Sequence, residues 1–438
     1  MLRWLKKIIV MVCVLSLLVS LLGCAKEEKT GTTETTEGKS TSSSSEEEVI
    51  LTVWLPSNNE SENKVMSEIM DAYNELNVGK VVVEYQFVPR ANAFAYEDKI
   101  SAAVTINQLP DVLMMDGPNV SNYAYSEIIK PITEFFTEDE LDDFVASMLS
   151  QGTYNGELYA LSPSESSVVI YYNKDIIDAA GIEVPMKLED AWTFDEFMEI
   201  VKTVHKDGEV YGVNIAPDYG TGEWMTYMPT LFLWSFGGNI ISEDGMTAEG
   251  YINSSASVEA MEYFQSLSNY SNWQATPTEF EEGRAAFKIC GSWLVPGFEA
   301  NPDLNWGITY LPYEKTHVAP SGDWAWGVSS TKHAKESADF LKYMLNAENI
   351  ENFTTIAAKP PTRKSLLNAS ELWASYPRSI IKDQVINSGH PRPKTPAYPV
   401  VTQEFASAAV DLFLGADVKE RLDLAASNID ENLQRYFK

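Results

Sequence analysis

Two polar segments of the sequence combine a ring or a carboxylate with amide side chains, the groups that can recognise hydroxyl-rich ligands. One begins at Trp54 and includes Asn58, and the other begins at Asp116. A flat indole can pack against the apolar face of a cyclic ligand, while a carboxylate or an amide makes paired hydrogen bonds to hydroxyl groups. These three residues are therefore candidate ligand-binding residues. The alternative is that both segments only form turns around their proline and glycine residues.

Both segments directly follow apolar runs that predict β-strands buried on both faces. The expected order is strand 49–55, helix 65–76, strand 81–88, helix 94–107 and strand 111–115. Such a β-α-β-α-β order predicts a parallel, doubly wound sheet, in which a ligand binds beyond the carboxyl ends of the strands. Those ends carry the two candidate segments. Further along the chain we expect a strand at 168–172 and helices at 193–206, 263–270, 333–347 and 402–437.

The composition describes a large, acidic, globular protein. The chain has 438 residues, with 32 Lys and Arg against 63 Asp and Glu, a formal net charge of −31. At about 150 residues per domain, this length predicts two or three domains. The acidity argues against nucleic acid as a partner and against docking of the folded part on anionic lipids. The aromatic content of 11 Trp, 21 Tyr and 18 Phe suits a carbohydrate binder, although most of these rings are expected in the core.

The N-terminus has the pattern of a secretion signal. Three basic residues precede sixteen uncharged residues, 8–23, fewer than the ~20 apolar residues that a membrane-spanning helix needs. The run ends in residues 21–24, Leu-Leu-Gly-Cys, which resemble the lipobox of bacterial lipoproteins. This resemblance implies that residues 1–23 are a signal peptide, and that Cys24 becomes the first residue and carries two acyl chains. The alternative is an uncleaved signal anchor.

Residues 24–48 are the expected link between the lipidated Cys24 and the folded body. After Cys24 the segment contains eleven Ser and Thr, seven Glu and three Lys, with no apolar residue beyond Ala25. This composition cannot form a core and predicts a disordered tether. We therefore expect the body to begin near Val49 and to work outside the cell, on the extracellular face of the cytoplasmic membrane of a Gram-positive bacterium.

The reactive residue types do not indicate a cofactor or a metal site. Cys290 is the single cysteine of the body, so the body has no internal disulfide and no CxxC metal or redox motif. The histidines stand far apart, at positions 205, 317, 333 and 390, which argues against a His-rich zinc site. We expect no cofactor, no metal and no catalytic residue.

A series of short phrases carries a family resemblance. The leading phrases are YYNKD at 171–175, AGI at 180–182 and WTFDEF at 192–197. Behind a lipobox, and with further phrases in the same order, they resemble the family 1 extracellular solute-binding proteins, the sugar receptors of ABC importers, which are related to maltose-binding protein. The further phrases are LPDV at 109–112, GG at 237–238, GRAAF at 283–287, GSW at 291–293, GDWAWGV at 322–328 and PTRK at 361–364.

The resemblance implies an α/β, two-lobed, periplasmic-binding-protein-like fold of type II. Each lobe would be a mostly parallel sheet flanked by helices, with hinge strands between the lobes. Lobe 1 would combine residues 49–170 with 316–362, and lobe 2 would combine residues 171–315 with 363–438. A sugar would lie in the cleft, and the lobes would close over it because the ligand touches both lobes only in the closed state.

The resemblance also implies candidate residues in the later part of the chain. Trp293 matches the tryptophan of the family's Gly-Pro-Trp phrase, which stacks on sugar, although Ser292 stands here in place of the proline. Trp324 and Trp326 alternate on an expected strand; we expect Trp324 to face the cleft and leave Trp326 undecided. Asp323 could accept hydrogen bonds from hydroxyl groups. The alternatives are a core role for Trp293 and a turn-forming role for Asp323.

Three further candidates follow from the same resemblance. Trp224 and Tyr227 precede a helix where the family places stacking aromatics, in a register that differs from that of maltose-binding protein. Arg363 could bond a hydroxyl group or an acidic sugar, or it could be an ordinary solvated arginine.

The predicted function is that of a lipid-anchored, monomeric receptor that binds a mono- or oligosaccharide without chemistry. It would deliver the sugar to two ABC permease subunits and their ATPase. One alternative is a secreted glycoside hydrolase, which needs two carboxylates about 5–10 Å apart. The sequence has no GxSxG or HExxH phrase, but its many acids do not exclude such a pair. The other alternative is a receptor for a solute that is not a sugar.

Overall fold

The computed structural model describes residues 48–90, 94–329 and 333–436. The predicted signal peptide, Cys24 and the tether up to residue 47 lie outside the described residues. Within the described ranges, no helix is both long enough and apolar enough to cross a membrane. Residues 47–438 cluster as one unit, and the two lobes described below are parts of it.

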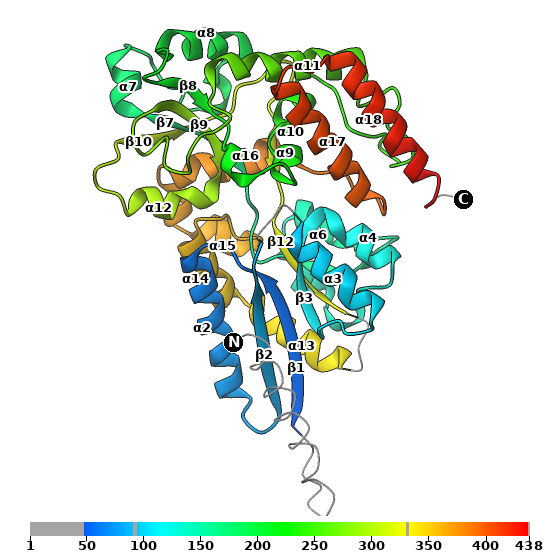
Figure 1. Cartoon of the computed structure of the whole chain (residues 1–438). Helices are drawn as coiled ribbons and strands as arrows, with labels where there is room; N and C mark the ends of the chain where they lie inside the picture. Colours follow the sequence, from blue (N-terminus) through cyan, green and yellow to red (C-terminus); the bar gives the residue numbers. More distant parts are fainter. Residues whose placement is uncertain (1–47, 91–93, 330–332, 437–438) are drawn as a thin grey trace, which may run out of the picture. The chain divides into compact units, whose positions relative to one another are not determined.

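The first sheet has the strand order β2-β1-β3-β12-β6 in the described part of the chain (Figure 1). Its strands are β1 Val49–Pro56, β2 Val81–Val88, β3 Val112–Asp116, β6 Ala160–Leu161 and β12 Trp324–Val328. β1 runs parallel to β2 and to β3, as the expected alternation of strands and helices predicts. β-Branched and aromatic residues dominate β2, which suits a pleated, partly buried surface.

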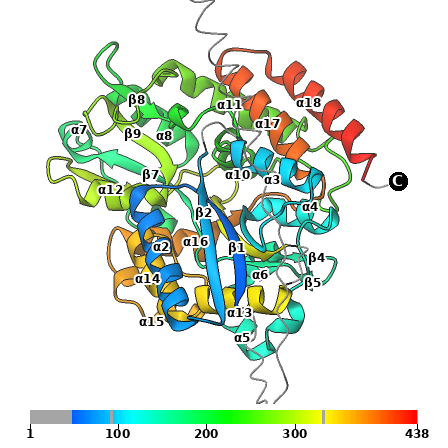
Figure 2. The same cartoon turned by 60° about the horizontal axis from the view of Figure 1, so that its bottom comes forward.

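Helices lie on both sides of this sheet. In both views α2 and α14 lie on one side of β1 and β2, and α3 lies on the other (Figures 1 and 2). α2 begins before the expected residue 65, because Asn59 caps it by accepting a hydrogen bond from the backbone N–H of Glu62 at 2.9 Å. The helices here are α2 Glu60–Leu76, α3 Ala95–Thr105, α4 Val120–Tyr125, α5 Glu138–Asp142, α6 Ala146–Gly152, α13 Ala334–Met344 and α14 Ala347–Ala357.

The second sheet has the order β10-β7-β9-β8 in the described residues. Its strands are β7 Val168–Asn173, β8 Tyr211–Asn214, β9 Ala285–Gly291 and β10 Trp306–Thr309. Every residue of β7 and β9 is buried, so these strands form the centre of the second core. The helices that follow are α7 Lys174–Ala179, α8 Phe194–Val204, α9 Trp224–Tyr227, α10 Thr230–Ser235, α11 Ser255–Ser266, α12 Val295–Glu299, α15 Lys364–Ala369, α16 Arg378–Ser388, α17 Tyr398–Phe413 and α18 Val418–Leu433.

Two separate hydrophobic cores support the division into two lobes. One core takes buried residues from 51–161 and 325–357, and the other from 168–319 and 358–433. We call these two parts lobe 1 and lobe 2. The chain leaves lobe 1 after β6 and enters lobe 2 at β7. The boundary expected after residue 170 therefore falls inside β7, whose pairing with β9 places the whole strand in lobe 2.

Both sheets are mixed, although the described strands of the lobe 1 sheet other than β12 all run in one direction. β12 pairs antiparallel with β3 and β6, and β7 pairs antiparallel with β9 and β10. A parallel neighbour requires a crossover along the sheet, whereas β12 joins the first sheet as the chain returns from lobe 2. The antiparallel pairing aligns Asp116 at the end of β3 with Trp324 at the start of β12, and so brings two candidate residues together.

Short strands lie where the chain passes between the lobes. β11 Ala319–Ser321 pairs parallel with β13 Gly389–Pro391, and Ser167 forms a bridge with Ser321. A further bridge joins Ser164 to Pro361, where the chain passes from lobe 1 into lobe 2 for the last time. We call residues 162–167, 319–323 and 389–392 the hinge.

The single helix expected over residues 402–437 is two helices in the structure. α17 and α18 lie side by side (Figure 1) and are joined by a short turn. The turn contains Gly415, whose φ of +98° lies in the left-handed region that favours glycine. The apolar periodicity continues through the turn, which is why the pattern alone does not show the break.

The capping box at the start of α8 gives a test of the local structure. Thr193 accepts a hydrogen bond from the backbone N–H of Glu196, whose side chain in turn accepts from the backbone N–H of Thr193. We expect Thr193→Ala to lower the free energy of unfolding by about 1 kcal/mol, because an N-terminal N–H of the helix loses its acceptor. Urea denaturation measures this loss. The matched control is Thr203→Ala on the exposed face of α8, and equal losses in the two variants would contradict the assignment.

Candidate ligand-binding site

Aromatic side chains of lobe 2 form a cluster at the end of β9. The ring of Trp293 lies 6.1 Å from the rings of Tyr219 and Trp224, and 6.5 Å from the ring of Tyr227, to which it is nearly parallel. Its Nε1 donates a hydrogen bond to the Tyr219 hydroxyl at 2.7 Å. We call these residues the aromatic cluster. The structure therefore brings together Trp293, Trp224 and Tyr227, and adds Tyr219, which the sequence did not single out.

The turn after β9 sets the position of Trp293. A Cβ on Gly291 would overlap the indole, so the ring lies directly across this glycine. Ser292, which replaces the proline of the family phrase, is fully buried, and its backbone N–H donates to the carbonyl of Ser167 in the hinge at 3.0 Å. Trp224 and Tyr227 are buried behind Trp293, which stays partly exposed. A partly exposed ring backed by buried rings is a surface on which a flat apolar face can stack.

Beside the aromatic cluster, Arg392 joins the two lobes through buried ion pairs. Its guanidinium is 4% exposed along the side chain and binds both oxygens of Asp116, at 2.6 and 2.7 Å. The same group also pairs with Glu223 at the start of α9 and lies 4.6 Å from the ring of Tyr227. Asp116 belongs to lobe 1, whereas Glu223 and Tyr227 belong to lobe 2. One hinge residue thus connects carboxylates of both lobes to the aromatic cluster.

Glu223 is held by lobe 2 as well as by Arg392. The Tyr398 hydroxyl donates to its Oε1 at 2.5 Å, and the Thr402 hydroxyl donates to its Oε2 at 2.6 Å. Burial raises the pKa of Glu223 above its ordinary value, although Arg392 acts against this shift and Asp116 adds to it. Because each carboxylate oxygen has two lone pairs, Glu223 and Asp116 keep capacity for hydroxyl donors of a ligand.

Glu97 in the first turn of α3 interacts electrostatically with Asp116 and Glu223. Burial raises its pKa to about 7; Arg90 lowers the pKa, while Asp116 and Glu223 raise it. Three acidic groups therefore share this region with two guanidinium groups. The net charge of these five groups is close to zero when Glu97 is protonated.

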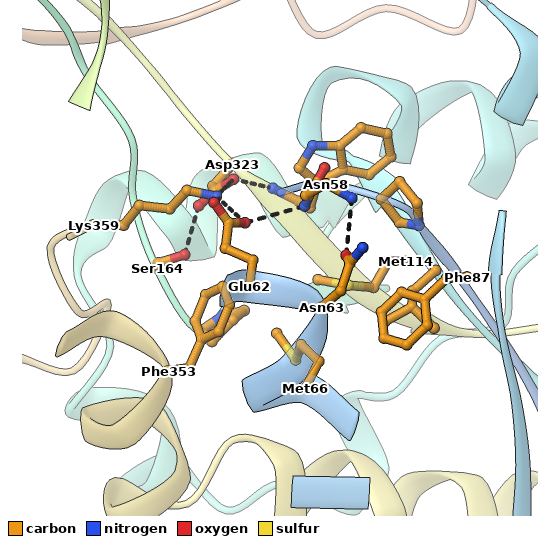
Figure 3. A pocket seen from close by; sticks show the side chains of 14 residues that line it. Asn58, Glu62, Asn63, Met66, Phe87, Met114, Ser164, Asp323, Phe353 and Lys359 are labelled. Atoms are coloured by element: carbon orange, nitrogen blue, oxygen red, sulfur yellow. Dashed lines mark hydrogen bonds and ion pairs between the residues drawn. The ribbon is translucent and has the colours of Figure 1, made fainter. Parts of the chain in front are cut away.

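On the lobe 1 side, Asp323 and Asn58 belong to a second buried network (Figure 3). Lys359 Nζ lies 3.0 Å from Glu62 Oε2 and 3.4 Å from Asp323 Oδ1. Ser164 donates to Asp323 Oδ2 at 2.5 Å, and Asn58 Nδ2 donates to Glu62 Oε2 at 3.1 Å. Burial alone would lower the pKa of Lys359, but the nearby carboxylates outweigh it and raise that pKa. Asp323 and Asn58 therefore already have protein partners that fix their positions.

A small cavity lies between this network and the apolar floor of lobe 1. Met66, Phe87, Met114 and Phe353 form the floor, as Figure 3 shows, and Trp324 lines the cavity with them. The cavity has about 10 Å³ of space for water, which corresponds to about one water molecule. In this arrangement of the lobes the cavity has no room for a sugar ring.

Trp324 and Trp54 are partly exposed and lie against cations. The Trp324 ring lies 5.0 Å from the Arg90 guanidinium and packs edge-on against Tyr96. The Trp54 ring lies 3.9 Å from Lys99 Nζ. The two indoles therefore lie near the candidate residues of lobe 1, Trp54 close to the carboxyl end of β1 and Trp324 beside the end of β3.

Trp326 and Arg363 lie away from both networks. Trp326 is fully buried in the lobe 1 core and packs edge-on against Phe340, which decides the question that the sequence left open. Arg363 donates to the carbonyl of Leu345 at 2.8 and 2.9 Å and to Asp143 at 3.2 Å. It therefore ties together segments of lobe 1, and the structure does not bring it to the other candidate residues.

Several residues of the site were not found from the sequence. Arg392 stands between two prolines in a stretch without periodic pattern, so no local signal marks it. Glu223 lies directly before Trp224, which the resemblance singles out. A carboxylate next to that ring could therefore have been noticed in the sequence. Lys359 and Glu97 carry no pattern that separates them from other surface charges.

No group of three or more His, Cys, Asp or Glu side chains is arranged to hold a metal ion within the described residues. Cys290 lies beneath the aromatic cluster, where burial raises the pKa of its thiol to about 12 and Lys288 acts against the shift. The thiol is therefore protonated at neutral pH and chemically inert.

Comparisons with known proteins identify the family and the fold of the chain. The chain matches the profile of a family described as "Bacterial extracellular solute-binding protein" over residues 68–379. It is 24% identical over 427 residues to the galactooligosaccharide-binding protein of Bacillus subtilis (strain 168), and the match covers 93% of each chain.

Solved structures show the same fold. The cyclic α-maltosyl-1,6-maltose-binding protein of Arthrobacter globiformis is 24% identical, with a TM-score of 0.74, and the match covers 88% of this chain and 99% of that one. An ABC transporter solute-binding protein of Thermotoga lettingae, bound to α-D-tagatose, is 21% identical, with a TM-score of 0.77 and coverage of 88% and 100%. The expected type II, two-lobed α/β fold is thereby confirmed.

The ion pairs of Arg392 generate a prediction about stability. We expect Arg392→Leu to lower the free energy of unfolding by about 3–5 kcal/mol, because Asp116 and Glu223 then remain buried without a cation. Urea denaturation at pH 7 measures the loss. The triple variant with Asp116→Asn and Glu223→Gln removes the uncompensated charges and should regain part of it. A loss below about 1 kcal/mol in the single variant would show that the pairs do not join the lobes.

Proposed function

The chain belongs to the family of bacterial extracellular solute-binding proteins, and from this premise we propose that its ligand is a mono- or oligosaccharide held between the two lobes. Members of this family bind solutes for ABC importers and are not enzymes. The family assignment therefore excludes the glycoside hydrolase alternative. The observation that carries the proposal is the partly exposed Trp293, backed by buried rings, beside the buried carboxylate of Asp116 and the half-buried carboxylate of Glu223. The sugars in the names of the related proteins support it.

Each part of the site has a role in holding a sugar. Trp293 offers a face on which the C–H side of a pyranose ring stacks, with Tyr219 at its edge. Asp116 and Glu223 accept hydrogen bonds from hydroxyl groups, and the cost of leaving such buried groups unpaired gives selectivity between sugars. Trp54 and Trp324 supply further ring surface from lobe 1.

Closure of the lobes follows from the same arrangement. A ligand between Trp293 of lobe 2 and Trp324 of lobe 1 touches both lobes, and so shifts the hinge equilibrium toward the closed form. The ion pair between Arg392 and Asp116 already joins the lobes on this side. The contacts of the ligand with the two lobes therefore add to the ion pair that already joins them.

Delivery completes the proposed function. The chain acts as a lipid-anchored receptor that hands its sugar to two ABC permease subunits and their ATPase. The lipobox-like residues 21–24 support attachment through an acylated Cys24. Mass spectrometry of the mature N-terminus tests the anchor: a first residue other than an acylated Cys24 would overturn it.

A ligand screen tests the proposed function directly. We expect one or more sugars from a panel of mono- and oligosaccharides to raise the melting temperature of the body. A ligand at 100 times its dissociation constant stabilises the folded state by about 2.7 kcal/mol. The sugar recovered after the experiment should be intact. Cleaved sugar, or stabilisation only by peptides, polyamines or metal ions, would contradict the proposal.

Trp293 gives the sharpest single-residue prediction. With the sugar that the screen identifies, Trp293→Ala should weaken binding by about 1–3 kcal/mol, the scale of one buried aromatic contact. Isothermal titration calorimetry measures the change. The matched control is Trp273→Ala, a partly exposed tryptophan of lobe 2 that packs against Phe413 outside the site. If a folded Trp293→Ala variant binds as tightly as the control, Trp293 is not part of the site.

A further inference from the structure

Buried polar atoms without partners lie behind the loop that carries Asp323 and Trp324. Gln151 and Glu165 are each 3% exposed. Among the described residues, the Oε1 and Nε2 atoms of Gln151 and the Oε2 atom of Glu165 have no hydrogen-bond partner. Unpaired buried polar atoms destabilise a fold and are uncommon in proteins, so their concentration in one place requires a physical explanation.

Gln151, near the end of α6, fills the space between two glycines. A Cβ on Gly117 would overlap the Gln151 side chain, and a Cβ on Gly322 would lie 2.8 Å from its Nε2. Gly117 follows Asp116 and Gly322 precedes Asp323, so the amide lies against both loops that carry candidate residues of lobe 1. The two loops also contact each other, because the backbone N–H of Gly117 donates to the carbonyl of Asp323 at 3.2 Å.

Glu165 lies in the hinge between two serines that bind the same loop, since Ser164 donates to Asp323 Oδ2 and Ser166 donates to the carbonyl of Gly322. Ser147, one helical turn before Gln151 on α6, donates to Glu165 Oε1 at 2.9 Å. Burial raises the pKa of Glu165 to about 7; the Ser147 hydrogen bond lowers it, Asp323 raises it, and the backbone of Gly322 lowers it. Near neutral pH the carboxyl group is therefore divided between its protonated and ionised forms.

The groups around Glu165 do not neutralise its charge. Asp323 faces it from the loop, and Tyr227 faces it from α9 of lobe 2, where the Tyr227 hydroxyl lies 3.2 Å from Ser166 Oγ. Lys359 is the cation on the lobe 1 side, and it pairs with Asp323 and Glu62. Within the described residues no ion pair joins a basic side chain to Glu165, so ionisation places an uncompensated charge in the hinge.

We propose that Glu165 is a positioning residue of the ligand site: protonated, it stays buried and keeps its neighbours Ser164 and Ser166 bonded to residues 322 and 323, and ionised, it loosens these contacts and releases the loop of residues 321–324. The proposal rests on the proposed function, because the loop carries Asp323 and Trp324 to the ligand side. An uncharged carboxyl group tolerates burial, whereas a carboxylate with an unpaired oxygen requires water, which only a movement of the loop supplies. The unpaired amide of Gln151 favours the same movement.

The direction of the pH dependence follows from linkage. The buried arrangement, in which the pKa of Glu165 is about 7, binds the proton more tightly than an arrangement that exposes the group, whose ordinary pKa is 4.5. The buried arrangement is therefore fully favoured at low pH, loses its advantage as the pH rises from about 4.5 to about 7, and changes little above. Ligand affinity should fall by at most tenfold per pH unit in that window, the limit for one proton.

The first experiment needs no ligand. Hydrogen exchange of the amides of residues 319–328, corrected for intrinsic rates, is measured on the mature chain at pH 5 and pH 8. The proposal expects several-fold greater protection at pH 5 in the wild type, and equal protection at both values in Glu165→Gln. The matched control is Glu281→Gln, which alters another carboxyl with an unpaired buried oxygen and a raised pKa, in lobe 2. Protection independent of pH in the wild type, or an unchanged pH dependence in Glu165→Gln, would overturn the proposal.

Gln151→Met is a second variant that keeps the size of the side chain and removes the unpaired amide. It should increase the protection of the loop at both pH values and leave the pH dependence intact. A decrease in protection would show that the amide holds the loop instead of favouring its release, and would overturn that part of the proposal.

The second experiment measures affinity for the sugar that the screen identifies, from pH 5 to pH 8. The wild type should lose affinity as the pH rises toward 7, while Glu165→Gln keeps its low-pH affinity throughout. The same pH profile in both proteins would overturn the proposal. If the wild type binds no sugar but the exchange results hold, the sugar assignment fails and the positioning role of Glu165 stands.

Discussion

The buried guanidinium of Arg392 is the interaction on which the arrangement of the site depends. It binds both oxygens of Asp116 in lobe 1, pairs with Glu223 in lobe 2 and lies over the ring of Tyr227. Without this cation, two carboxylates would face each other in a region that excludes water. Their repulsion would weaken the contact between the lobes. The hinge, the acidic groups and the aromatic cluster thus share one charged group.

The lobe 1 side of the site depends on a second network with a different task. Lys359 neutralises Glu62 and Asp323 within the protein, and Asn58 and Ser164 complete their hydrogen bonds. These side chains hold the loops after β1 and before β12 in fixed positions. The aromatic rings and the remaining lone pairs of Asp116 and Glu223 are the groups that the proposed function assigns to the ligand. A site of this kind suits an uncharged ligand with many hydroxyl groups, because its ionic groups are largely paired with one another.

The antiparallel entry of β12 explains why residues far apart in sequence meet at one edge. A parallel strand at this position would place the start of β12 beside the start of β3, at the opposite edge of the sheet. The antiparallel strand instead aligns Trp324 with Asp116. The same return path brings β11 beside β13, so one continuous segment, residues 319–328, supplies both a hinge strand and the strand that carries Trp324.

Local sequence patterns were enough to predict most helices and strands and to name several of the aromatic rings. Strand 81–88 is found with its expected bounds, because its β-branched run favours extended backbone whatever surrounds it. The start of α8 is visible in the Thr193 and Glu196 capping box, and Trp293, Trp224 and Tyr227 could be named from short phrases. Whether these residues touch a ligand remains a prediction that the proposed variants test.

The pairing of the charged groups, in contrast, follows from the packing of distant segments. Arg392 is separated from Asp116 by 276 residues and from Glu223 by 169 residues, and no periodicity or capping rule links positions so far apart. The mixed direction of the sheets, the burial of Trp326 and the lobe 1 role of Arg363 are likewise consequences of packing. Local propensity depends on neighbours within a few residues, whereas a buried ion pair forms only where the packing of distant segments brings opposite charges out of water together.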